Sequence, residues 1–321
     1  MRLHKTKQFF FVLIKLSIVV AAFYFIYDKL AYNSELSFSN FISFLSINAI
    51  FTIKNTFILL ILSSLNWLFE IIKWQTLIST LKKISLKQAL KQTLGSLTAS
   101  LITPNRIGEY GAKAMFYLPK LRKHVMLINL ISNLQQMSVT IILGAIGLFA
   151  FINTYNLEAN YARLIVTVVI GIITVSLILL GLAQYEIGIK WTPLLKLKVF
   201  IENFPGEKIR IGFSLSLVRY AIFSFQFFYL LQIFQIEISY LDSMMVITTM
   251  YLLVSIIPTI FIFDVVIKGS VAVYLFEFLG VNDLVILSVI TIMWILNFVL
   301  PSLIGSYFVI QFKMPKPQTN S

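Results

Sequence analysis

Three charged side chains of alternating type lie close together in a chain of which 59% is hydrophobic. They are Arg106, Glu109 and Lys113, within the stretch Thr103-Pro104-Asn105-Arg106-Ile107-Gly108-Glu109-Tyr110-Gly111-Ala112-Lys113. The apolar run 94–102 leads directly into this stretch, so we expect it to lie at membrane depth. Charged side chains are costly at that depth, so their presence indicates a functional site.

The types and order of these residues suit the binding of an anion. Thr103 can cap a helix that begins at Pro104, where the missing N–H of proline does no harm. The free N–H groups of such a helix end attract a phosphate. Arg106 lies in the first turn, and its guanidinium can donate two parallel hydrogen bonds to the same phosphate. It is therefore the central candidate for phosphate binding. Glu109 and Lys113 lie four residues apart, in the order that favours an ion pair within a helix.

A looser copy of this pattern occurs near Pro258. Asp264 follows this proline by six residues, and Lys268 follows Asp264 by four. Two such patterns fit an internal repeat. Both acid–lysine pairs remain open to two interpretations: they contact a ligand directly, or they only pair with each other and lock the helices together.

Two further charged residues stand inside apolar stretches. Arg219 needs an acid or a phosphate, and the candidate acids are Glu70, Glu109 and Asp264. For Glu70 the sequence favours a structural pairing with Lys73, whose amine can reach the inner membrane surface along its apolar stem.

Long apolar runs position these groups. Each is near the 20 residues or so that span hydrocarbon, which predicts an all-α polytopic membrane protein with about six full spans. They lie at about 8–27, 55–78, 125–152, 162–184, 211–234 and 284–311. A β-barrel would show alternation instead. The first run ends without a small-residue cleavage site, so we expect a retained span rather than a signal peptide.

Charges between the runs alternate in sign, and this alternation orients the chain. Basic residues gather in 1–7, 73–91, 120–123, 190–210 and 313–316, whereas the intervening polar stretches are acidic or neutral. Under the positive-inside rule both termini are cytoplasmic. The net charge of +13 then serves orientation and contact with anionic lipids, and no nucleic-acid partner is expected. There is no cysteine, and His4 and His124 lie in basic segments, so we expect neither a metal nor a cofactor.

Two remaining apolar segments enter and leave on the same side. Segment 94–119 has basic flanks, after an amphipathic stretch 85–93 on the inner surface, and 243–279 has acidic flanks. Each is predicted to be a re-entrant hairpin broken at its proline. The chain would then be one membrane domain, 1–321, with inverted repeats at about 55–152 and 211–311. The alternative treats 106–119 as a loop and 243–279 as two ordinary spans.

The stretch Pro104-Asn105-Arg106-Ile107-Gly108-Glu109 resembles the motif of the lysylphosphatidylglycerol synthase transmembrane region family, a flippase-type domain. Lys73-Trp74 and the residues from Phe263-Asp264 to Lys268-Gly269-Ser270 are similar to other recurrent positions of that family. Asn105 departs from it, because a glycine is common there. The resemblance implies a bacterial inner-membrane protein that moves or binds an anionic phospholipid, without the aminoacyl-transferase domain and so without enzyme activity. The site residues would be Thr103, Arg106, Glu109, Lys113, Asp264, Lys268, Arg219 and Glu70. The alternatives are a membrane-embedded lipid-headgroup transferase or hydrolase, with Glu109 or Asp264 as general base, and a non-transporting scaffold.

Overall fold

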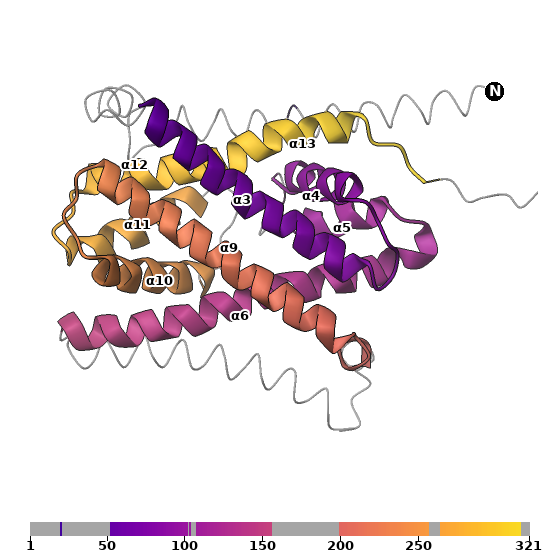
Figure 1. The fold of residues 1–321 in the computed structure, drawn as a ribbon, viewed down its shortest axis with the longest axis horizontal. Coiled ribbons are helices and arrows are strands. Elements are labelled where there is room, and N and C mark those ends of the chain that lie inside the picture. Colours follow the sequence, from indigo (N-terminus) through magenta and orange to yellow (C-terminus); the bar gives the residue numbers. More distant parts are fainter. Residues whose placement is uncertain are drawn as a thin grey trace, which may run out of the picture.

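The computed structural model describes residues 52–101, 103, 107–155, 199–256 and 264–315, together with Val20. This part of the chain is helical and contains no strand (Figure 1). Its elements are α3 (Ile53–Ile78), α4 (Leu86–Ser100), α5 (Gly108–Met115), η2 (Pro119–Leu121), α6 (Arg122–Tyr155), α9 (Gly206–Ile233), α10 (Tyr240–Ile256), α11 (Asp264–Glu277), α12 (Asp283–Trp294), η3 (Ile295–Val299) and α13 (Leu300–Ile310).

Four helical stretches are long and apolar enough to cross a membrane, as expected for a multi-pass membrane protein. They are α3, η2 with α6, α9, and the continuous rod of α12, η3 and α13, with 26, 37, 28 and 28 residues. They confirm the spans predicted at 55–78, 125–152, 211–234 and 284–311. The spans predicted at 8–27 and 162–184 lie outside the described residues.

Each of the two predicted hairpin segments contains a pair of shorter helices. The first pair is α4 and α5, and the second is α10 and α11, and in both the two helices pack against each other. Pro104 and Pro258, where the breaks were predicted, lie outside the described residues. The amphipathic segment predicted at 85–93 is not separate from the first hairpin segment, because residues 86–93 form the first turns of α4. A capping box between Ser85 and Gln88 starts that helix.

The packing centres on α3 and α9, which lie against each other along much of their length. In Figure 1 they cross the molecule as neighbouring diagonals that run in opposite directions. Outside this pair, α4 packs on α13 and α10 packs on α6.

The apolar interior is divided into two main clusters. One is built mainly by α9, α10, α11 and α12, around Phe227, Val246 and Phe276. The other is built mainly by α3, α4, α5 and the start of α6, around Trp74 and Ile128. Burial of such side chains is the chief stabilising contribution in a protein interior.

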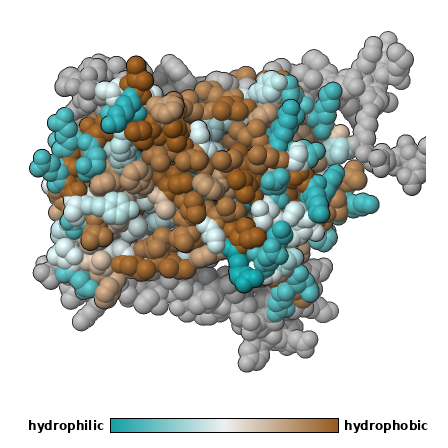
Figure 2. All heavy atoms as spheres, in the orientation of Figure 1, coloured by the Kyte–Doolittle hydropathy of each residue, from teal (hydrophilic) through white to brown (hydrophobic). Residues whose placement is uncertain are grey.

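The outer surface carries a broad apolar zone. Figure 2 shows it as a brown region across the middle of this face, with hydrophilic side chains gathered at the two ends of the long axis. Exposed apolar residues such as Phe57, Ile146 and Leu217 come from three of the four spans. Such a zone between polar ends is the surface that a bilayer covers.

Candidate functional site

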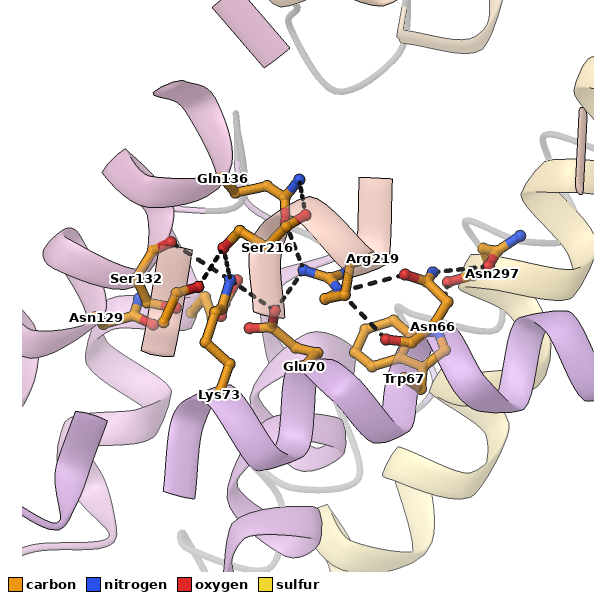
Figure 3. A network of polar contacts seen from close by, with 12 residues as sticks. Asn66, Trp67, Glu70, Lys73, Asn129, Ser132, Gln136, Ser216, Arg219 and Asn297 are labelled. Carbon is orange, nitrogen blue, oxygen red and sulfur yellow. Dashed lines mark hydrogen bonds and ion pairs between the residues drawn. The ribbon is translucent and has the colours of Figure 1, made fainter. Parts of the chain in front are cut away.

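An ion pair links the two central helices. The Nη1 group of Arg219, on α9, donates to Oε2 of Glu70, on α3 (Figure 3). Arg219 Nη1 also donates to Oε1 of Gln136 at 3.1 Å, and its Nε donates to the carbonyl and Oδ1 of Asn66, both at 3.2 Å. The Arg219 side chain is 17% exposed. Of the three acids that the sequence suggested as partners of Arg219, Glu70 is therefore the one that pairs with it in the structure.

Lys73 extends the ion pair deeper into the bundle. Its Nζ lies 2.9 Å from Glu70 Oε2 and 3.4 Å from both the Ser132 carbonyl and the Ser216 hydroxyl. Only 1% of its side chain is exposed. The prediction that this amine reaches the membrane surface was wrong, because the lysine turns inward to the face that α3 shares with α6 and α9.

A second ion pair joins the same cluster. Lys113 Nζ, on α5, lies 2.7 Å from Oε1 of Glu109, as the spacing predicted, and 2.8 Å from Oδ1 of Asn129. Its side chain is 0% exposed. Lys73 contacts Ser132 and Lys113 contacts Asn129, three residues apart on α6, so the two ion pairs are neighbours in the bundle. We call the following five residues the charge cluster: Glu70, Lys73, Glu109, Lys113 and Arg219. When all five groups are ionised, the charge cluster carries one net positive charge.

Trp74 fixes α5 against α3 and α4. The Lys113 amine lies 4.3 Å from the centroid of its ring, at cation–π distance. The indole N–H donates to Oε1 of Gln92 at 2.8 Å, and the Tyr117 hydroxyl donates to the same oxygen at 2.9 Å. The position of Lys113 is therefore set by three helices.

A chain of amides continues from the charge cluster toward the other end of α3. Asn66 Nδ2 donates to Asn297 Oδ1 at 3.0 Å, and Asn297 Nδ2 donates to Gln226 Oε1 at 3.0 Å. Gln226 Nε2 donates in turn to the Leu59 carbonyl at 3.1 Å. The residues of α3 that take part span positions 59 to 73, or about 21 Å at 1.5 Å per residue. A continuous set of polar contacts therefore runs through most of an apolar bundle.

The π-helix η3 supplies acceptors to this chain, and Pro301 explains why. A proline at this position has no N–H for the carbonyl of Asn297, four residues earlier. The Leu300 N–H bonds to the Ile295 carbonyl, so the Leu296 carbonyl also loses its usual donor. Side chains of α3 donate to both freed carbonyls: Ser63 to Leu296 at 2.6 Å and Trp67 to Asn297 at 3.1 Å.

The structure brings four predicted site residues together, namely Glu70, Glu109, Lys113 and Arg219. Thr103 still acts at the start of α5, where its hydroxyl accepts from the Gly108 N–H at 2.9 Å. Helix α5 is described from Gly108 onward, and the predicted helix start at Pro104 lies outside the described residues. Lys268 lies on α11, where its amine is 5.7 Å from the centroid of the Phe298 ring. Arg106 and the side chain of Asp264 lie outside what the structure describes.

The amides were missed as site residues. Gln92, Asn129, Gln136, Gln226 and Asn297 all belong to the polar network, and none was selected from the sequence. A signal was available, since Asn129, Gln136 and Asn297 stand inside the apolar runs 125–152 and 284–311.

Among the described residues, no group of three or more His, Cys, Asp or Glu side chains could hold a metal ion. No protein-family model matches this chain, and comparison with curated proteins and with solved structures gave no significant match.

Proposed function

We propose that this protein is a membrane transporter of the flippase type that binds the headgroup of an anionic phospholipid inside its bundle and moves it across the membrane. The observation that carries the proposal is the Arg219–Glu70 pair, buried where α3 crosses α9. Intramembrane charges of this kind mark substrate pathways. The guanidinium of Arg219, whose planar fork matches a phosphate, favours an anionic headgroup over a cation.

We further propose that two inverted repeats, 55–152 and 211–311, form the transport fold. Helix packing supports this. We match α3 with α9, α4 with α10, α5 with α11, and α6 with the α12–α13 rod. Under this matching, the contact of α4 with α13 in one unit corresponds to the contact of α10 with α6 in the other. The contacts of α5 with α6 and of α11 with α12 also match. The two apolar clusters belong mainly to one unit each. Transporters built this way hold their substrate at the repeat interface, where Arg219 and Glu70 meet.

Sequence spacing supports the same matching. Gln136 and Asn297 stand 161 positions apart, and Gly144 and Gly305 stand the same distance apart. A Cβ on Gly144 would press on Thr248 and Leu252, whereas a Cβ on Gly305 would press on Leu94 and Thr98. Thr248 lies 154 positions after Leu94, and Leu252 lies 154 positions after Thr98. Pro258 likewise lies 154 positions after Pro104.

The shorter helices fit re-entrant hairpins. Helix α5 has 8 residues and α11 has 14, or about 12 and 21 Å at 1.5 Å per residue. Over the residues that the structure describes, neither reaches the roughly 30 Å of a hydrocarbon core. We propose that α4 with α5 enters from the cytoplasm and α10 with α11 from outside.

Charge gives the orientation that this proposal requires. The end of α3, the starts of α6 and α9, and the end of α13 gather at one end of the bundle (Figure 1). Basic residues flank these termini: Lys82, Lys83, Arg122, Lys123, Lys208, Arg210 and Lys313. This end is therefore the cytoplasmic one in our proposal, with both chain termini on that side of a bacterial inner membrane.

The test reconstitutes the full chain in liposomes and follows a fluorescent phosphatidylglycerol, with fluorescent phosphatidylcholine as the neutral comparison. We expect faster movement of the anionic lipid than in empty liposomes, and a loss of at least tenfold in Glu70→Gln/Arg219→Gln. This double variant removes both charges of the Arg219–Glu70 pair, and it leaves Lys73 without its carboxylate. Arg210→Gln is the matched control, because Arg210 is exposed on the same helix. Wild-type protein that moves no lipid would refute the transport function, whereas an active double variant would refute only the site.

A membrane-embedded headgroup transferase or hydrolase, with Glu109 or Asp264 as base, remains the second proposal, and a scaffold the third. Turnover of a lipid by the purified protein would favour the second. Arg106→Ala belongs in the same transport assay, since the sequence placed this arginine at the phosphate.

A further inference from the structure

Two fully buried donors beside the charge cluster have no hydrogen-bond partner among the described residues. They are Nδ2 of Asn129 and the hydroxyl of Ser132, both on α6. Both residues are 0% exposed. A donor left in this state costs about 1–3 kcal/mol, so a pair of them three residues apart on one helix face calls for an acceptor.

The same two residues contact the two buried ammonium groups. Asn129 accepts from Lys113 through Oδ1 at 2.8 Å. Ser132 accepts from Lys73 through its carbonyl at 3.4 Å (Figure 3). Lys73 reaches Ser216 Oγ at 3.4 Å as well, and both of these contacts are longer than the usual 2.7–3.2 Å. Lys73 therefore has three acceptors, two of which lie at the long end of hydrogen-bonding distance.

The net charge of the charge cluster indicates which kind of acceptor would bind beside the two donors. When all are ionised, the five groups of the charge cluster carry one net positive charge. A buried charge is tolerated when it is paired. A water molecule would accept from the two donors but would leave the positive charge unbalanced. One monovalent anion would accept from both donors and balance that charge.

We infer that Asn129, Ser132, Lys73 and Lys113 form a binding site for one small monovalent anion of halide type, apart from the lipid headgroup site at Arg219. The ion accepts from the free amide and hydroxyl, and it balances the charge cluster. The complete burial of Asn129, Ser132 and Lys113 favours a compact ion over a phosphodiester with two ester arms. This inference goes beyond the proposed transport function and does not depend on it.

Thermal unfolding of the purified full chain in detergent tests the site. Chloride is titrated against gluconate at constant ionic strength, which removes general screening from the comparison. We expect chloride, and bromide likewise, to raise the unfolding midpoint in a saturable manner, because a ligand bound only by the folded state stabilises it. Equal midpoints in chloride and gluconate at every concentration would overturn the inference.

Two variants locate the ion. In Asn129→Asp, the new carboxylate supplies the negative charge beside Lys113, so we expect the chloride dependence to disappear while stability in gluconate rises to that of the wild type in chloride. Asn133→Asp, which adds the same charge one turn away on α6, should keep the chloride dependence. Ser132→Ala removes one donor to the ion, and its apparent chloride affinity should fall about tenfold or more. Wild-type chloride dependence in both Asn129→Asp and Ser132→Ala would show that the ion binds elsewhere.

Discussion

The carbonyl of Asn297 accepts the indole N–H of Trp67 at 3.1 Å, across 230 positions of sequence. It can do so because Pro301 offers it no N–H. A proline in the rod of α12, η3 and α13 and a tryptophan in α3 are thus connected by one carbonyl. The same turn places the Asn297 side chain between Asn66 and Gln226, so a backbone irregularity sets the position of the amide chain.

Pro301→Ala should straighten this turn. An N–H at position 301 can bond to the Asn297 carbonyl, and Ala favours a helix interior over Pro by about 3 kcal/mol. We expect unchanged or higher stability but slower lipid movement, because Asn297 would leave the amide chain. Thermal unfolding and the liposome assay measure the two effects, with Pro205→Ala before α9 as the control. Transport at the wild-type rate would contradict the role assigned to η3.

The Arg219–Glu70 pair should show strong energetic coupling. Glu70→Gln leaves both Arg219 and Lys73 without their carboxylate, and breaking a buried pair costs about 3–5 kcal/mol. Arg219→Gln should cost less, because Glu70 keeps Lys73. The double variant should be more stable than the sum of the single losses predicts, by about 0.5–3 kcal/mol. Denaturant unfolding in detergent measures the free energies of unfolding for this double-mutant cycle. Glu207→Gln, at an exposed position, serves as the control. Additive losses would mean that the two groups do not interact in the membrane.

Gly305→Ala should destabilise the contact of α13 with α4. A Cβ there would overlap the Leu94 carbonyl and the Thr98 hydroxyl, and overpacking of this kind costs about 1–3 kcal/mol. Gly144→Ala should behave in the same way against α10. Gly111→Ala is the matched control: a Cβ on Gly111 meets nothing within 4 Å, so the better helix propensity of Ala should leave stability equal or slightly higher. Similar unfolding midpoints for Gly305→Ala and Gly111→Ala would rule out close packing at α13.

The orientation can be measured directly, since the chain has no cysteine. Single cysteines at Lys83 and Lys120 flank the first hairpin, and cysteines at Asp242 and Asp283 flank the second. A membrane-impermeant thiol reagent added to intact cells should label the second pair and spare the first, because our proposal places the basic flanks in the cytoplasm. Labelling that differs within either pair would show that its segment crosses the membrane fully.

The sequence alone determined the features that depend on neighbouring residues. Continuous apolar runs predicted α3, α6, α9 and the last rod within a few residues, because a helix in hydrocarbon must satisfy its backbone internally and needs a minimum length. The spacing of Glu109 and Lys113 predicted their ion pair, because residues four apart meet on one helix face.

Only the tertiary structure decided which helix faces meet. Local periodicity places Arg219 inside a span, but it cannot select Glu70 over Glu109, since that choice depends on how α9 crosses α3. The inward turn of Lys73 has the same cause: an amine near a helix end can reach water or turn to the bundle, and the acceptors on α6 and α9 make the second arrangement possible. Asn129, Gln136 and Asn297 gained partners because packing brings distant amides together where water is excluded and unpaired polar groups are costly.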